Sequence, residues 1–173
     1  MNYKMMGRFL GQILFIEALL MIPALGISLF CADAMAARGF VWSIVLAAAI
    51  SVILYLLCKG APNAFRAKEG FVCVALSWII MSLVGCLPFY VSREIPHFVD
   101  AFFETVSGFT TTGASIVPEV EKLSKGILYW RSFSHWVGGM GVLVFLLAIA
   151  PSVFLLMINL VHIILIFFVF VLS

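Results

Sequence analysis

Four consecutive residues, Thr110, Thr111, Thr112 and Gly113, form a Thr/Gly-rich turn directly behind a short apolar stretch. An extended turn of small and β-branched residues can direct successive main-chain carbonyl oxygens toward one axis, where they replace the water shell of a dehydrated cation. Gly113 allows a backbone conformation that is closed to residues with a Cβ atom, and threonine hydroxyls supply further oxygen ligands or bracing hydrogen bonds. The turn therefore predicts cation coordination in an ion pathway.

Three charged side chains flank this turn. Asp100 and Glu104 lie on the apolar stretch before it and would raise the local cation concentration near the outer mouth of a pathway. The carboxyl-terminal end of a helix over this stretch would also direct partial negative charge at the turn. Arg131, near the start of the next apolar stretch, is expected at the membrane interface; alternatively, it positions the loop or meets Asp100 or Glu104.

The elements around the turn are those of a re-entrant loop. Residues 98–109 are apolar but reach only about half of the membrane thickness as a helix, and residues 118–125 form a polar return. Non-helical backbone at membrane depth is tolerated only where it is buried in protein or lines a water-filled cavity. The alternative is that residues 110–113 are only a polar connector in an outer loop.

Composition places the whole chain in a membrane. Of its 173 residues, 65% are apolar and 10% charged, against roughly 45–50% and about 25% in soluble domains, and the mean hydropathy is +1.23. Four or five crossings of about 20 residues fill this length, which excludes a sizeable extramembrane catalytic domain. A net charge of +2 is too small to indicate a nucleic-acid partner.

The apolar stretches predict an all-α integral membrane protein. Two leading transmembrane helices lie within residues 1–64 and are followed by one repeat of outer helix, re-entrant pore loop and inner helix within residues 65–151. Residues 152–173 form a C-terminal apolar segment, which either turns back at Pro151-Ser152 in a tight hairpin or is the non-native end of a truncated or frame-shifted product. The expected elements are spans at 10–31 and 40–58, the outer helix 71–91, the pore helix 98–109, the filter 110–115 and the inner helix 127–150.

Basic residues predict the orientation, because cytoplasmic loops carry an excess of Lys and Arg. With the N-terminus in the cytosol, the inner segments hold five basic residues and one acidic residue: Lys4, Arg8, Lys59, Arg66, Lys68 and Glu69. The outer loops then hold four basic and five acidic residues: Arg38, Arg93, Lys122, Lys125, Asp33, Glu94, Asp100, Glu119 and Glu121. The re-entrant loop is therefore expected to enter from the outside.

The remaining polar and small residues fit packing roles. The four cysteines form no CxxC pair and have no histidine at ligand spacing. They are expected to be apolar packing residues rather than metal ligands: Cys31, Cys58, Cys73 and Cys86. Glu17, inside the first span, is expected to snorkel or to form a helix–helix hydrogen bond, with a functional role as the alternative. Small residues at Gly138, Gly139 and Gly141 predict close helix approach. No serine-hydrolase motif is present, and no enzyme activity is expected.

Four segments together resemble the potassium-uptake family of TrkH and KtrB, which is related to the plant HKT transporters. Residues 100–114 are similar to the first pore loop of that family, 129–141 to the inner helix after it, 85–89 to the end of the outer helix and 66–71 to its basic start. The resemblance implies potassium translocation across the cytoplasmic (inner) membrane. It further implies that the carbonyls of Thr110, Thr111, Thr112 and Gly113 form one quarter of a selectivity filter. It also implies a homodimer and a cytosolic RCK-type nucleotide-binding regulatory subunit.

The chain contains one of the four pore repeats that the family carries in a single chain. One quarter of a filter cannot surround an ion, so transport requires self-assembly or repeats supplied elsewhere. The expected function is potassium uptake as a truncated transporter subunit, with potassium as substrate and no other metal or cofactor. The alternatives are a non-conducting remnant or structural partner, and a small channel that tetramerises from single repeats.

Overall fold

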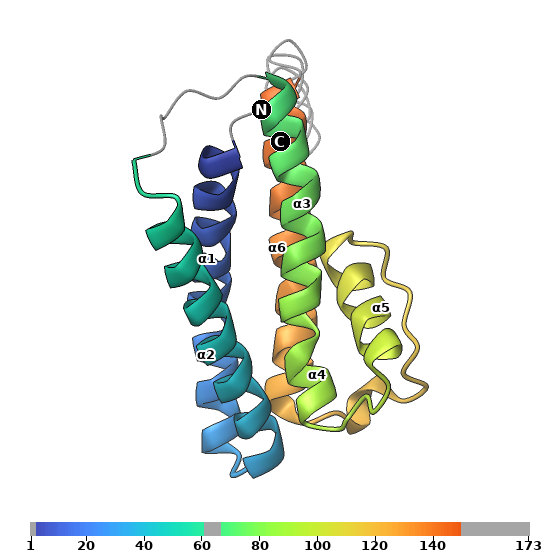
Figure 1. The fold of residues 1–173 in the computed structure, drawn as a ribbon. Coiled ribbons are helices and arrows are strands. Elements are labelled where there is room, and N and C mark those ends of the chain that lie inside the picture. Colours follow the sequence, from blue (N-terminus) through green and yellow to red (C-terminus); the bar gives the residue numbers. More distant parts are fainter. Residues whose placement is uncertain (1–2, 61–66, 150–173) are drawn as a thin grey trace, which may run out of the picture.

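A computed structural model describes residues 3–60 and 67–149 (Figure 1). Helices and turns make up these two ranges, which contain no β-strand and thus confirm the predicted all-α class. The expected C-terminal apolar segment lies outside the described residues. The helices are α1 (Tyr3–Phe30), α2 (Ala34–Leu57), α3 (Ala67–Gly85), α4 (Leu87–Val91), α5 (Phe98–Phe109) and α6 (Lys125–Ile149), with a 3-10 turn at Val120–Lys122.

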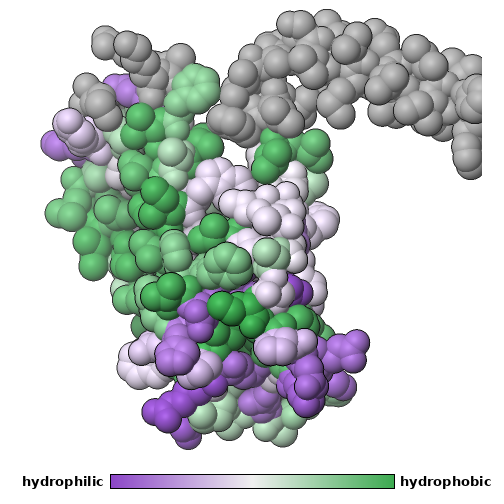
Figure 2. All heavy atoms as spheres, turned by 90° about the vertical axis from the view of Figure 1, so that its right-hand side faces the viewer, coloured by the Kyte–Doolittle hydropathy of each residue, from purple (hydrophilic) through white to green (hydrophobic). Residues whose placement is uncertain are grey.

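Long apolar helices confirm a multi-pass membrane protein. Within the described ranges, three segments are long and apolar enough to cross a bilayer: Tyr3–Phe30, Ala34–Leu57 and Glu69–Val91. Their outer surfaces carry large apolar side chains in contact with the surroundings, such as Trp42 and Leu57, as a lipid-facing surface requires. Hydrophilic residues instead gather at the lower end of the face shown in Figure 2, below a mostly apolar surface.

The chain runs up and down as an antiparallel bundle (Figure 1). Helices α3 and α6 overlap in the centre of this view, with the α1–α2 hairpin on one side and α5 on the other; α1 and α5 each pack against both of them. Helix α5 rises from the lower end only to about mid-height, and the chain then turns and returns to the same end before α6 begins. The largest fully buried side chains include Leu14, Met21, Phe40, Phe89, Phe109 and Trp130.

The α1–α2 hairpin is held by a short cap and by close backbone approach. Asp33 caps α2 by accepting a hydrogen bond from the Ala36 amide at 3.2 Å. Between the helices, the Ser51 hydroxyl donates to the Gly11 carbonyl at 2.7 Å. A Cβ atom at Gly11 would lie 3.2 Å from the Ser51 carbonyl oxygen, so the small residue is what allows the two backbones to approach.

The outer helix is interrupted where the sequence predicts one continuous span over 71–91. Helix α3 ends at Gly85, and α4 begins at Leu87 with Pro88 in its first turn. Proline has no backbone N–H, and its ring clashes with the preceding turn, so the helix breaks before it. The Gly85 carbonyl accepts a hydrogen bond from the Trp130 indole at 2.9 Å. This hydrogen bond at the break joins the outer helix to α6.

Candidate ion-coordinating site

The turn after α5 begins with a left-handed cap. The Thr111 amide donates to the Gly108 carbonyl at 2.9 Å and the Thr112 amide to the Ser107 carbonyl at 3.0 Å, which is the Schellman pattern that ends many helices. The pattern places Thr111 at φ 57°, a region that β-branched residues rarely occupy. Because such a conformation is unfavourable for threonine, the surrounding structure must hold it in place.

The main-chain carbonyl oxygens of the turn accept no hydrogen bonds from the described residues. Gly113 also has a positive φ, 75°, so the turn contains two left-handed residues. In the part of the chain that the structure describes, no hydrogen bond ends on the carbonyl oxygen of any residue from 110 to 113. All four residues are exposed. Four successive unpaired carbonyls at the end of a half-length helix are the groups that a cation filter needs.

The threonine hydroxyls brace the turn from within. The Thr110 hydroxyl donates to the Val106 carbonyl at 2.7 Å, one helical turn earlier. Its oxygen also lies 2.8 Å from the Thr112 hydroxyl. Two of the three threonine side chains are therefore engaged with the helix end and with each other, which restricts the backbone without consuming the carbonyl oxygens of the turn.

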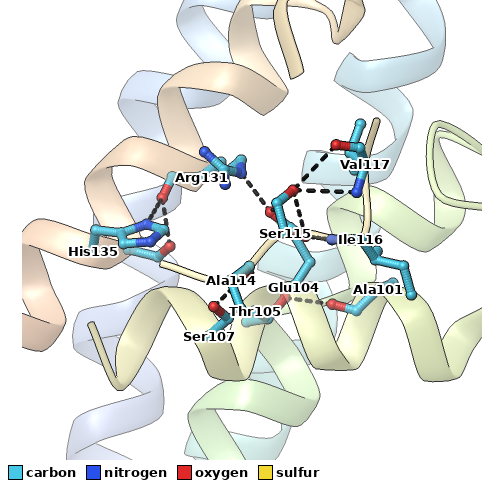
Figure 3. A network of polar contacts seen from close by, with 11 residues as sticks. Ala101, Glu104, Thr105, Ser107, Ala114, Ser115, Ile116, Val117, Arg131 and His135 are labelled. Carbon is cyan, nitrogen blue, oxygen red and sulfur yellow. Dashed lines mark hydrogen bonds and ion pairs between the residues drawn. The ribbon is translucent and has the colours of Figure 1, made fainter. Parts of the chain in front are cut away.

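Glu104 fastens the returning chain to α5 and α6 (Figure 3). Its carboxylate, 1% exposed, accepts hydrogen bonds from the Ile116 amide at 2.9 Å and the Ser115 hydroxyl at 3.1 Å. The Arg131 guanidinium of α6 donates to the same carboxylate, with 2.5 Å between Nε and Oε1. Hydrogen bonds to an ionised group are the stronger ones, so this cluster joins three segments at one point.

Ser107 makes a second connection across the turn. Its hydroxyl donates to the Ala114 carbonyl at 2.6 Å, while its own carbonyl accepts the Thr112 amide. One residue of α5 therefore holds both the first and the last part of the turn. Together with the Glu104 cluster, this contact fixes residues 110–116 to the helix from which they emerge.

Helix α6 packs against the end of α5 through two glycines. A Cβ atom at Gly138 would overlap the Phe109 carbonyl group, and one at Gly108 would lie 2.5 Å from the Ser134 hydroxyl oxygen. The Ser134 hydroxyl donates instead to the Arg131 carbonyl at 2.7 Å, and His135 Nδ1 lies 2.9 Å from the same oxygen. The close approach expected at Gly138 is therefore made to the helix that carries the turn.

The charged residues singled out in the sequence divide into two groups. Glu104 and Arg131 meet each other directly behind the turn. Asp100 lies in the first turn of α5, about 15 Å along the helix from Thr110 at 1.5 Å per residue. Within the described ranges it forms no ion pair. Sequence reasoning missed the roles of Ser107 and Ser115, although their positions on either side of the turn were a usable signal.

The TrkH family model, described as a cation transport protein, matches residues 37–171. The chain belongs to the TrkH family. The matched region includes most of the last apolar segment.

Individual relatives agree with this assignment. The chain is 36% identical to the Trk system potassium uptake protein TrkH of Halomonas elongata over 88% of its length, which is 32% of that protein. A cation transporter of Methanocaldococcus jannaschii is 45% identical over 48% of this chain. The crystal structure of the potassium transporter TrkH from Vibrio parahaemolyticus matches with a TM-score of 0.80 at 30% identity, over 87% of this chain and 32% of that one. The chain thus spans about a third of the length of these TrkH proteins, and all three relatives are named as transporters rather than enzymes.

Proposed function

We propose that the carbonyl oxygens of Thr110, Thr111, Thr112 and Gly113 form one quarter of a potassium filter, and that the chain takes part in potassium uptake. The observation that carries this proposal is the run of four main-chain oxygens at the end of a half-length helix that accept no hydrogen bond from any described residue. The named activity of the TrkH relatives supports the choice of potassium as the transported ion.

The flanking residues have distinct roles in this proposal. Glu104 and Arg131 act as positioning residues, because they hold the returning chain rather than face the ion. Asp100, at the start of α5, raises the cation concentration at the outer mouth. One loop supplies only one side of a coordination shell, so the other three sides come from the remaining length of the transporter or from further copies of this chain.

The topology supports a defined orientation in the cytoplasmic (inner) membrane. The start of α1, the end of α2 and the start of α3 lie at one end of the bundle, whereas the α1–α2 turn and both ends of the re-entrant segment lie at the other. The first end carries Lys4, Arg8 and Lys59, so it faces the cytosol by the positive-inside rule. The functional units are then the helix pair in 1–64, the pore repeat in 65–151 and the apolar segment in 152–173.

Two partners follow from the family resemblance and belong to the same proposal. The membrane subunit forms a homodimer, and a cytosolic RCK-type nucleotide-binding subunit regulates it. The cytosolic end defined above is where such a subunit would bind.

Growth at low potassium tests the proposed function. A bacterial strain without its own potassium uptake would express either this chain or a chimera in which it replaces the matching third of Vibrio parahaemolyticus TrkH. We expect the chimera to restore growth, because its filter regains four sides. Growth with the chain alone would indicate self-assembly. A chimera that reaches the membrane in normal amounts but restores no growth would identify the chain as a non-conducting remnant.

A further inference from the structure

Phe109, the last residue of α5, packs between two tryptophans. Its side chain is 1% exposed, and Thr110, the first residue of the turn, follows it directly. The Trp78 ring of α3 and the Trp130 ring of α6 both meet the Phe109 ring edge to face, with 6.5 and 6.4 Å between ring centroids. Aromatic pairs prefer this arrangement. Phe109, Trp78 and Trp130 are called the aromatic cluster below.

Each tryptophan of the cluster bridges α3 and α6. Trp130, on α6, donates its indole N–H to the Gly85 carbonyl of α3 at 2.9 Å. Trp78, on α3, lies against α6 at Gly141, where a Cβ atom would sit 3.4 Å from its ring. The α3 backbone also approaches Phe109 itself, because a Cβ atom at Gly85 would lie 3.0 Å from the Phe109 ring. The end of α5 is therefore held by both central helices at once.

This packing supports one of the two ends of the candidate filter. Residues 110–113 are exposed, so their position depends on the segments before and after them. After the turn, Glu104 and Ser107 hold residues 114–116 by hydrogen bonds. Before the turn, Phe109 packs against α3 and α6 through its ring. The polar contacts and the aromatic cluster thus fix opposite ends of the same turn.

The ion preference of a filter made of carbonyl oxygens depends on how those oxygens are arranged around the ion. On the basis of the function proposed for the turn, we propose that the aromatic cluster sets the position of its first carbonyl oxygens, with Phe109 as a positioning residue that determines ion preference. The Phe109 ring acts through the backbone and does not contact the ion. A smaller side chain at this position lets the end of α5 shift, so that the carbonyls after it no longer match potassium.

The experiment compares potassium and sodium uptake in cells that depend on the chimera described above. Phe109→Leu keeps an apolar side chain but loses both ring contacts. We expect the ratio of potassium to sodium uptake to fall several-fold in this variant, at equal amounts of protein in the membrane. This ratio does not depend on how much protein is folded, so a loss of stability alone would leave it unchanged.

Phe40→Leu on α2 is the matched control. Phe40 is also fully buried, but it forms no ring contact with the aromatic residues that the structure describes. Loss of a buried ring should lower the melting temperature in detergent in both variants, whereas the uptake ratio should change only in Phe109→Leu. Trp130→Phe is a milder variant, which keeps a ring beside Phe109 but loses the hydrogen bond to Gly85. It should lower the ratio less than Phe109→Leu does.

An unchanged uptake ratio in Phe109→Leu would overturn the proposal, because Phe109 would then be a packing residue only. An equal change in Phe40→Leu would overturn it as well. If Phe109→Leu does not reach the membrane, an unchanged ratio in Trp130→Phe decides against the proposal. An unmodified chimera without any preference for potassium would instead contradict the proposed function of the turn, and the role of Phe109 would fall with it.

Discussion

Glu104 and Glu17 are both about 1% exposed, yet their surroundings differ completely. Glu104, on α5, accepts hydrogen bonds from a guanidinium, a main-chain amide and a hydroxyl. Glu17 approaches the back of the same helix, near Phe109 and Thr105, without a single hydrogen bond among the described residues. The comparison teaches that nearby hydrogen-bond donors, rather than burial, decide the role of a carboxyl group in this fold. With donors around it, the group holds several segments together; without them, it forms no hydrogen bond.

Removing the charge of Glu104 should have the largest effect. In Glu104→Gln the Arg131 cation keeps its partly buried position, with its side chain 16% exposed, but loses its counter-ion. Breaking one partner of a buried pair costs about 3–5 kcal/mol. We expect a strong loss of thermal stability in detergent and of potassium uptake.

The exposed pair between Lys122 and Glu119 supplies the matched control. Its side chains are 75% and 63% exposed, and exposed pairs contribute about 0–1 kcal/mol. Glu119→Gln should therefore leave both measurements unchanged. Equal effects of Glu104→Gln and Glu119→Gln would remove the role assigned to the Glu104 cluster.

Two glycines of α6, Gly138 and Gly141, differ in how closely their neighbours pack against them. Gly138→Ala should displace the end of α5, because its Cβ atom would overlap the Phe109 carbonyl; overpacking of this kind costs about 1–3 kcal/mol. A Cβ atom at Gly141 would instead meet the Trp78 ring at an ordinary contact distance of 3.4 Å. Gly141→Ala should be neutral or slightly stabilising. Thermal melting of both variants tests this, and a Gly141→Ala chain less stable than Gly138→Ala would contradict it.

Replacing Glu17 should have the smallest effect and the opposite sign. Glu17→Leu removes a buried polar group that has no hydrogen bond among the described residues. Because an unsatisfied polar group costs roughly 1–3 kcal/mol when buried, we expect a melting temperature equal to or above that of the unmodified chain. A loss of stability comparable to that of Glu104→Gln would mean that Glu17 has a partner in the membrane.

Much of the helical arrangement was predictable from the sequence. The short apolar stretch before the turn predicted a half-length helix, and α5 ends at Phe109, where that stretch ends. The break before α4 was missed even though Pro88 is visible in the sequence. Hydropathy does not register the missing N–H, because the residues around Pro88 are as apolar as those of an unbroken span.

The details of the site depended on tertiary structure. The positive φ of Gly113 agrees with what its residue type suggests, but that of Thr111 does not, because the helix cap imposes it. The contacts of Ser107 and Ser115 exist only because the chain turns back along α5. Likewise, no local pattern shows that Glu17 lacks a hydrogen-bond donor among the described residues of α3 and α6.

Ion selectivity at Gly113 tests the central claim most directly. Cells that depend on the chain, or on the chimera that carries it, would be assayed for uptake of potassium and of sodium, with the unmodified turn and with Gly113→Ser. We predict that the unmodified turn prefers potassium and that the variant, expressed at the same level, loses this preference because φ 75° disfavours a side chain. Unchanged selectivity in the variant would contradict coordination by the carbonyls of residues 110–113.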